Sequence, residues 1–355
     1  MKFALSTEMH RESPDTPMER VLANSLEVVR LADRGGFHSV FTGEHHGIEL
    51  SIAPNPFTQL AVWARETERI RLGSAVVCAP YWHPMRLAGE VGLVDLLSGG
   101  RVEVGIGRGA YTYEFERMAP GVDPAHGREA LAELVPALKG LWGGDYAHDG
   151  AFWKFPAATA VPRPVQTPHP PIWISARHPD VFRFAVENEC DIMATPLHLP
   201  FAEVESLKER LDTAVAEAGG GFRPKLMMLR NAAVYEDAAS AREVAGHLKT
   251  HMRYFDTLFR NTGGVRGGFV DLADLEVLAG KENYDDDALV DNHVFGTPEQ
   301  VVEKLKRYEA AGVDTFMYGA SWGLPHEQEM RSLELFATEV MPAFAEQPVA
   351  AVGGR

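Results

Sequence analysis

The chain has 355 residues, of which 45% are hydrophobic and 24% are charged, an ordinary composition for a globular protein. Its formal charge of −16 disfavours binding to phosphate backbones and anionic lipids, so we expect neither nucleic acid nor a membrane as a partner. No apolar run approaches the roughly 18 residues of a membrane span, no signal peptide is recognisable, and two cysteines are too few for a disulfide framework, so we expect a cytoplasmic protein.

Short β-rich runs alternate with helical patterns from the first residues onward, which is typical of parallel strands joined by crossover helices. Strands are expected at 2–6, 39–42, 70–77, 101–105, 172–175, 191–195, 225–235 and 313–318. Helices are expected at 17–34, 56–67, 85–97, 128–142, 180–189, 201–218, 238–260, 298–311 and 327–340, with a long loop between 105 and 128. Eight strands in this alternation predict an α/β fold, a (β/α)₈ TIM barrel, because an open doubly wound sheet more often stops at five or six strands.

Two insertions interrupt the alternation. Residues 143–170 are rich in Gly and Pro, with a hairpin expected around Asp149-Gly150. The second insertion lies near 259–296; residues 261–296 are expected to be irregular, and a loop of this length is usually functional or disordered. We expect 1–345 to form one barrel domain and the small residues of 346–355 to be frayed.

The loop after the second strand carries the first candidate site. In a (β/α)₈ barrel the reactive groups follow the strands, and here a strand is followed by Gly43-Glu44-His45-His46-Gly47. Histidine is the side chain best suited to proton transfer near neutral pH. The position of these residues directly after a strand favours a catalytic role for them, although a solvated polar loop would have the same composition.

The loops after the fourth and fifth strands are candidate phosphate sites. Alternating glycines at 105–109 let a backbone approach a flat or anionic ligand, and Arg108 can contact a phosphate through two nitrogens. A plain barrel corner explains the glycines equally well. The pattern is not a dinucleotide fingerprint, since Ala110 stands where the third glycine is needed. After the fifth strand, Arg177 precedes a helix start, whose free N–H groups favour phosphate.

A metal site is the alternative use of the histidines. His45, His46, His83 and His178 could converge on one barrel mouth. Neighbouring histidines on a loop rarely share a metal, and no His-x-His or His-Glu-x-x-His pattern is present. We therefore expect no metal.

Several motifs occur in a characteristic order along almost the whole chain, most weakly across 143–170 and 259–293. They are Met1-Lys2-Phe3, Gly36-Phe37, Glu44-His45-His46, Asn55-Pro56, Leu72-Gly73-Ser74-Ala75, His83-Pro84 with Arg86, the segment 95–101, the segment 105–111, Gly296-Thr297-Pro298-Glu299 and Met341-Pro342. In order and spacing they resemble the bacterial luciferase-like family of flavin-dependent monooxygenases, especially the luciferase alpha subunit.

The resemblance implies that FMN binds at the C-terminal mouth of the barrel. It implies that His45 is catalytic near the reactive edge of the flavin, with Glu44 in a weaker role that orients it. It also implies the following flavin contacts: Arg108 at the phosphate with Gly109 and Tyr111 beside it, a phosphate turn of Ala176, Arg177, His178 and Val181, Thr195 near the ring, and a non-proline cis peptide between Ala75 and Val76 under the ring. Gly107 stands where luciferase has a reactive cysteine, and Arg177 and His178 replace Glu and Ser in the phosphate turn.

The resemblance further implies a two-component monooxygenase. An NAD(P)H-dependent flavin reductase would supply reduced FMN, O₂ would form a C4a-peroxyflavin, and a small organic substrate, of carbonyl type, would be oxidised. Residues 259–293 would be the lid, and relatives pair through helices on one barrel side, which implies a homodimer. The alternatives are an F420-dependent hydride-transfer oxidoreductase of the same superfamily, a non-catalytic flavin-binding protein and a metal-dependent barrel hydrolase.

Overall fold

Eight parallel strands close into a barrel in the computed structural model, which describes residues 1–278, 281 and 284–345. Around the barrel the order is β1 (Lys2–Ser6), β2 (Ser39–Thr42), β3 (Arg71–Ser74), β5 (Val102–Gly107), β8 (Ile172–Ser175), β9 (Asp191–Ala194), β10 (Leu226–Val234) and β14 (Thr315–Gly319). β14 pairs with β1, with Lys2 opposite Thr315, and so closes the ring. The (β/α)₈ TIM-barrel prediction is confirmed, and all eight strands overlap the runs expected from the sequence.

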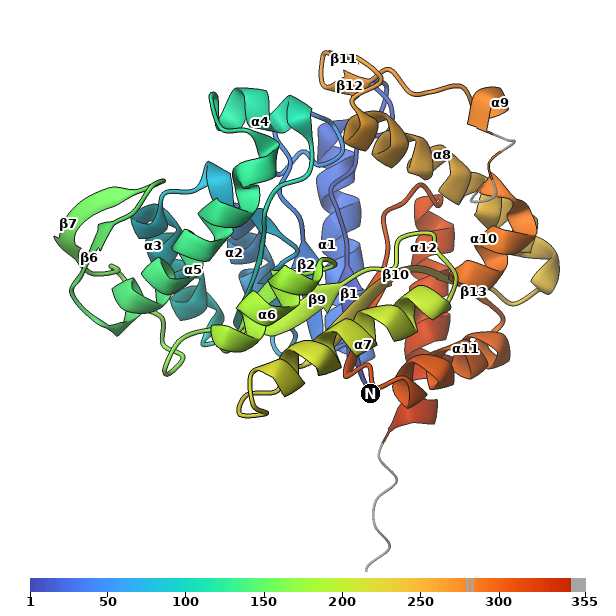
Figure 1. The fold of residues 1–355 in the computed structure, drawn as a ribbon. Helices are drawn as coiled ribbons and strands as arrows, with labels where there is room; N and C mark the ends of the chain where they lie inside the picture. Colours follow the sequence, from blue (N-terminus) through green and yellow to red (C-terminus); the bar gives the residue numbers. More distant parts are fainter. Residues whose placement is uncertain (279–280, 282–283, 346–355) are drawn as a thin grey trace, which may run out of the picture.

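Helices surround the barrel (Figure 1). They are α1 (Met18–Gly35), α2 (Pro56–Glu66), α3 (Pro84–Ser98), α5 (Gly127–Gly143), α6 (Pro179–Glu187), α7 (Ala202–Glu217), α8 (Ala241–Arg260), α11 (Pro298–Ala310) and α12 (His326–Leu335). α2, α3 and α6 share one start signal, in which a polar side chain precedes a proline at the first helical position. The side chains of Asn55, His83 and His178 accept the N–H groups two residues later and cap these helices. No helix within the described ranges is both long and apolar enough to cross a bilayer.

The barrel interior is filled by large side chains and by two glycines that make room for them. Ala4, Phe41, Trp173, Met193, Met227 and Met317 form this inner cluster. A Cβ at Gly73 would lie 2.2 Å from the Phe41 ring, and one at Gly105 would lie 2.0 Å from the Ser74 carbonyl oxygen. These glycines therefore permit close packing of the barrel wall.

Three elements differ from the sequence prediction. The strand expected at 70–77 is broken, since β3 ends at Ser74 and β4 (Val77–Cys78) resumes pairing with β5. The loop expected between 105 and 128 contains α4 (Thr112–Met118). The last helix changes to a wider π turn at 336–340 and a 3₁₀ turn at 341–344.

The first insertion forms the expected hairpin, from β6 (Tyr146–Asp149) and β7 (Lys154–Ala158). The Glu133 carboxylate on α5 accepts the N–H groups of Ala151, Phe152 and Trp153, at 2.9–3.0 Å, and fixes the hairpin turn. The hairpin projects from the barrel on the left of Figure 1.

The second insertion is more ordered than expected. It contains the hairpin of β11 (Val265–Arg266) and β12 (Phe269–Val270), then α9 (Leu275–Leu278), α10 (Asp286–Asn292) and β13 (Val294–Gly296). β13 pairs with the end of β10, with Ala232 opposite Val294. The prediction of an irregular segment at 261–296 is therefore wrong for these stretches. The expectation of a frayed tail concerns 346–355, which lie outside the described residues.

Candidate active site

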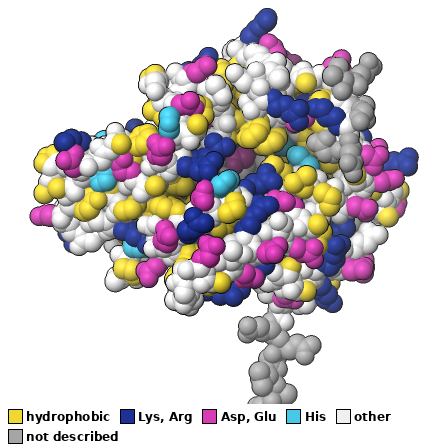
Figure 2. Space-filling model, viewed as in Figure 1, with side chains coloured by type: hydrophobic (Ala, Val, Ile, Leu, Met, Phe, Trp, Pro, Cys, Tyr) yellow, Lys and Arg dark blue, Asp and Glu magenta, His cyan; other side chains and the backbone are white. Residues whose placement is uncertain are grey.

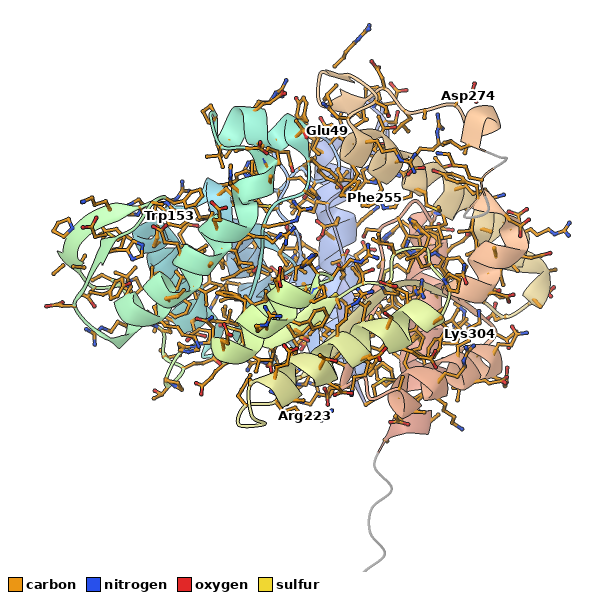
Figure 3. All side chains as sticks on the ribbon, viewed as in Figure 1. Glu49, Trp153, Arg223, Phe255, Asp274 and Lys304 are labelled. Carbon is orange, nitrogen blue, oxygen red and sulfur yellow. The ribbon has the colours of Figure 1, made fainter. Side chains whose placement is uncertain are left out.

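The second insertion covers the end of the barrel where the strands finish. α4, α8 and the β11–β12 hairpin lie at this end, the upper end in Figure 1. The Glu49 N–H donates to the Gly268 carbonyl at 2.8 Å, and Arg11 pairs with Glu49 at 3.0 Å while its guanidinium lies over the Phe269 ring. Glu49 is labelled in Figure 3 at this junction. The insertion therefore packs directly against the loop that carries His45.

His45 forms a buried pair with a glutamate from α4. Its Nδ1 lies 3.2 Å from Oε1 of Glu114, which is almost fully buried and also accepts the His46 N–H at 2.7 Å. The His45 ring stacks on Tyr111 at 5.6 Å. Burial alone would lower the pKa of His45, but the hydrogen bond and charge of Glu114, with the charges of Glu8 and Glu44, raise it above its ordinary value. This arrangement leaves Nε2 as the nitrogen available for proton transfer.

Glu44, which was expected to orient His45, is hydrogen-bonded to other groups. Its Oε1 lies 2.6 Å from Nε2 of His46, and its Oε2 accepts the Cys78 N–H at 2.7 Å and the Trp82 indole N–H at 2.9 Å. Among the residues that the structure describes, it makes no hydrogen bond to His45. Glu44 acts on His45 through its charge and ties the His45 loop to the segment after β4.

A second carboxylate, Glu8, approaches His45 from the loop after β1. Its Oε1 accepts the Gly43 N–H at 2.7 Å. Burial raises the pKa of Glu8 to about 7, against the opposing effects of the His45 charge and the Gly43 N–H. His45 thus contacts Glu114 and is also influenced by the charge of Glu8, and both acids were missed from the sequence. Glu8 could have been identified from the sequence, because it is an acidic residue two positions beyond the first strand. Glu114 could not, because it lies in a segment that was predicted to be a loop.

At the mouth of the barrel, Gly107 lies directly against the Ala75-Val76 segment. The Ala75-Val76 peptide bond is cis, as the resemblance implied. A Cβ at Gly107 would lie 2.6 Å from a Val76 methyl carbon, so no larger residue fits beside this bond. Thr195, at the end of β9, accepts the Leu197 N–H at 3.0 Å and is partly exposed.

Arg108, which follows β5, and the exposed Arg128 at the start of α5 are close enough for their charges to interact, and neither has an acidic partner among the described residues. Burial and the nearby positive charge of Arg128 lower the pKa of Arg108. Neither guanidinium forms a hydrogen bond or ion pair within the described part of the chain. Two adjacent unpaired guanidinium groups fit an anionic ligand such as a phosphate. The sequence analysis found Arg108 but missed Arg128, which lies one residue inside α5 and had no local signal.

The turn before α6 differs from the expected phosphate seat. His178 Nδ1 accepts the Asp180 N–H at 3.3 Å and the His178 carbonyl accepts the Val181 N–H at 2.9 Å, so these helix-start N–H groups are already bonded. Ala176 is buried and its N–H donates to Met193. The Arg177 side chain pairs with Glu203 at 3.3 Å, while its buried Nε has no partner among the described residues. Near this turn, the hydrogen-bond donors without a partner among the described residues therefore include an arginine side chain, whereas the N–H groups of Asp180 and Val181 at the helix start are already bonded.

The unpaired guanidinium of Arg108, with Arg128 nearby, suits an anionic group such as the phosphate of a flavin nucleotide. By contrast, the histidines considered as metal ligands do not converge, because His46 bonds Glu44 while His83 and His178 cap helices. In residues 1–278, 281 and 284–345, no group of three or more His, Cys, Asp or Glu side chains is arranged to hold a metal ion. The chemistry that this arrangement supports is proton transfer at His45, in a site where unpaired arginines are available to an anionic group.

The His45–Glu114 pair leads to a prediction about pH. Glu114→Gln removes the negative charge that raises the pKa of His45, so this pKa should fall. The limb of the pH–rate profile that reports His45 is expected to move to lower pH by about one unit. Steady-state rates between pH 5 and 9 measure this shift, with Glu116→Gln on the same helix as the control. An unmoved limb in Glu114→Gln would show that Glu114 does not set the protonation of His45.

Comparisons with known proteins show which sequences and folds this chain is similar to. The family model for luciferase-like monooxygenases matches residues 1–315. The chain is 40% identical over 349 residues to the oxygenase component of the flavin-dependent trigonelline monooxygenase of Acinetobacter baylyi, covering 98% of this chain and 97% of the relative. The crystal structure of monooxygenase RslO1 from Streptomyces bottropensis is 27% identical, with a TM-score of 0.80 and coverage of 97% of this chain and 100% of that one. An F420-dependent secondary alcohol dehydrogenase shares the fold, with 16% identity, a TM-score of 0.77 and coverage of 97% and 99%.

Proposed function

This chain belongs to the luciferase-like monooxygenase family, and on that premise we propose that it works with reduced FMN delivered by a separate NAD(P)H-dependent flavin reductase. It is a flavin-dependent monooxygenase of the oxygenase-component type. The observation that carries the proposal is the buried His45–Glu114 pair beside a cis-peptide floor and two unpaired arginines.

The residues have distinct roles toward the flavin. Arg108 and Arg128 would hold the phosphate, with Gly109, Tyr111 and the 176–181 turn beside it, and the Ala75-Val76 peptide and Thr195 would contact the ring. When bound, reduced FMN supplies the electrons and the reactive C4a carbon that activate O₂. With the two electrons of reduced FMN and two protons, monooxygenation would place one atom of O₂ in the substrate and release the other as water.

The protein moves protons and excludes water in this scheme. His45 Nε2 delivers or accepts the proton at the reacting oxygen, because Nδ1 is held by Glu114. The second insertion keeps bulk water from the mouth through its contacts with Glu49 and Arg11. We propose a small organic substrate, either a carbonyl compound or an N-heteroaromatic compound such as the trigonelline named for the relative.

Transfer of labelled oxygen tests this function. Anaerobic protein with reduced FMN and trigonelline, or one of a panel of aldehydes and ketones, is mixed with ¹⁸O₂, and products are analysed by mass. We expect one ¹⁸O atom per product molecule, formed only when protein is present. If every compound yields only hydrogen peroxide at the rate of free reduced FMN, the oxygenase proposal is wrong.

The second candidate function is hydride transfer with F420, which the fold shared with the alcohol dehydrogenase favours. Equilibrium titration of the protein with FMN, reduced FMN and F420 separates the two. Tight binding of F420, together with no detectable binding of reduced FMN to the protein, would support this candidate.

We also propose that the protein forms a homodimer through α2 and α3. Val62, Leu93, Leu96 and Leu97 on these packed helices are each 43–53% exposed. A patch of exposed apolar side chains on adjacent helices marks a protein interface, and a second copy offers a matching surface.

A charge placed in this patch should separate the copies. Leu93→Glu with Leu97→Glu is expected to convert a dimer into a monomer, measured by light scattering after size-exclusion chromatography. Leu199→Glu is the control, because Leu199 follows β9 on the opposite side of the barrel and is equally exposed. A wild-type monomer, or a double variant that stays dimeric, would contradict the assignment of this face.

A further inference from the structure

A cleft on the flank of the barrel reaches Glu8, the acid whose charge acts on His45. The cleft has a volume of about 230 Å³ and lies between the loop after β1, the loop after β14, and the neighbouring helices α1 and α12. Neither α4 nor α8, which flank the hollow of the mouth in Figure 2, contributes a described residue to its lining. The polar side chains that line it include Glu8, His10, Glu12, Ser25, His326 and Glu329.

Glu8 lies between this cleft and the candidate site. Its Oε1 accepts the Gly43 N–H at 2.7 Å. A Cβ at Gly43 would lie 2.8 Å from that oxygen and 3.4 Å from the Ala75 carbonyl oxygen, so the carboxylate is next to the Ala75-Val76 segment. The charges of Glu8 and His45 each affect the pKa of the other group, as expected for neighbours. One carboxyl group thus adjoins the cleft on one side and the site on the other.

The lining of the cleft is suited to water. Four buried atoms on its residues have no hydrogen-bond partner among the described residues, namely Nδ1 and Nε2 of His10, Oγ of Ser25 and Nδ1 of His326. Buried polar atoms are nearly always hydrogen-bonded, to protein or to ordered water. A water molecule occupies about 30 Å³ in the liquid, so a cleft of this volume with several polar partners holds a group of waters.

The other end of the cleft opens to solvent. Glu12 is exposed at its rim, and a Cβ at Gly323 would lie 3.1 Å from Oε1 of Glu12. His326 connects the cleft with the surface in a second way. Its Nε2 lies 2.9 Å from Oε2 of Glu27, whose side chain is 56% exposed, while its Nδ1 is buried and unpaired within the described part of the chain. Protons from solvent can therefore enter past Glu12 or through the two nitrogens of His326.

The groups around Glu8 leave its charge free to change. Within the described residues no lysine or arginine forms an ion pair with it, and the charge that acts on it is that of His45. Burial raises the pKa of Glu8 to about 7, so it takes up and releases a proton near neutral pH. The remaining titratable neighbours of the cleft are Glu329, which accepts the Ser321 N–H at 2.5 Å, His251 and Tyr254 of α8, which pack against the His10 ring at 5.7 and 4.8 Å, and His247, whose charge acts on Glu12.

We propose that Glu8 relays protons between the water of this cleft and His45. After His45 has given its proton to the reacting oxygen, the Glu8 carboxyl group returns one to the imidazole, and the carboxylate then takes a proton from the cleft. This transfer passes through water, because no hydrogen bond joins the two described side chains directly. The inference rests on the proposed function. It allows the mouth to close during the reaction without separating His45 from solvent protons.

Glu8→Gln tests the relay, because glutamine keeps the size of the side chain and can still accept the Gly43 N–H but has no acidic proton. Single-turnover product formation is measured in H₂O and D₂O with trigonelline, or with the compound of the panel that takes up ¹⁸O. We expect the rate to fall at least about tenfold and its solvent isotope effect to increase, with FMN affinity unchanged. Glu8→Asp should recover part of the rate. Glu19→Gln, an exposed position on α1, is the control.

A rescue experiment tests the cleft as the route. Formate added to Glu8→Ala should raise the rate in proportion to its concentration, because a small acid can enter the cleft and replace the missing carboxyl group. Ser25→Leu in the same background places an apolar side chain in the cleft and should abolish this rescue. The melting temperature of each variant shows whether it is folded.

Infrared difference spectra between pH 5 and pH 9 follow Glu8 without flavin or turnover. We expect a protonated carboxyl band at pH 5 that disappears at pH 9, shifts in D₂O and is absent from Glu8→Gln. The shift in D₂O reports exchange of the Glu8 proton with solvent. A Glu8 band that does not shift in D₂O would contradict access through the cleft.

An unchanged rate and isotope effect in Glu8→Gln, or formate rescue that persists with Ser25→Leu, would overturn the inference. A slower rate with no change in isotope effect and no recovery in Glu8→Asp would assign Glu8 a structural role and overturn it as well. The wild-type sample reports on the proposed function separately. Normal product formation in both wild-type and Glu8→Gln protein would refute only the relay, whereas no ¹⁸O-labelled product from wild-type protein would refute the proposed function and the relay with it.

Discussion

His45→Ala is expected to bind FMN as tightly as the wild-type protein and to lose product formation by about 10²–10⁴-fold, the usual contribution of a general acid or base. The reason is geometric: Glu114 holds Nδ1, burial limits access of water, and Nε2 is the nitrogen free to exchange a proton with a reactant. Alanine removes the imidazole without touching the arginines that would hold the phosphate.

The measurement pairs a flavin titration with single-turnover product yield. His83→Ala is the matched control, because His83 is an exposed histidine whose ring caps α3. It should lose about 1 kcal/mol of stability at most and retain activity. Normal product yield in His45→Ala would remove His45 from the mechanism, and weak FMN binding in that variant would assign His45 to cofactor binding instead.

Arg108→Ala is expected to weaken FMN binding by about 10–100-fold, the range for loss of charge-assisted hydrogen bonds to a phosphate. Burial and the neighbouring Arg128 lower the pKa of Arg108, and no acidic partner within the described ranges compensates its charge. A bound phosphate would supply the missing negative charge. Arg108→Lys should recover only part of the affinity, because lysine cannot make the two-nitrogen contact.

Fluorescence titration with FMN and with riboflavin checks this prediction. Riboflavin lacks the phosphate, so its affinity should be the same in wild-type and Arg108→Ala protein. Arg117→Ala serves as control, since Arg117 is exposed and lies over the Tyr113 ring. An unchanged FMN affinity in Arg108→Ala, or an equal loss for riboflavin, would mean that Arg108 does not bind the phosphate.

The barrel strands could be predicted because each is a short apolar run bounded by turn residues. β2 and β8 are found at the expected residues, and the loop after β2 places His45 at the mouth as expected from strand–loop order alone. What could not be predicted is the direction of individual side chains. Glu44 and Glu114 are both acids near His45, yet only the folded loop shows that Glu44 turns toward His46 and Cys78 while Glu114 meets His45.

Short elements in the second insertion were missed for a related reason. β13 has three residues and α10 seven, too few for a hydrophobic period to be recognised. β13 exists because β10 extends beyond the barrel and offers its last residues for pairing. The pairing of His10 with His251 joins segments about 240 residues apart and therefore left no local pattern.

The most direct test of the central claim is the flavin absorbance after anaerobic protein with reduced FMN is mixed with O₂. If the protein is a flavin-dependent oxygenase with His45 at its reacting centre, reoxidation will show a slow phase that free FMN lacks, and His45→Ala will change the rate of that phase. Reoxidation at the rate of free reduced FMN, together with tight binding of F420, would contradict the account and leave only the fold and family standing.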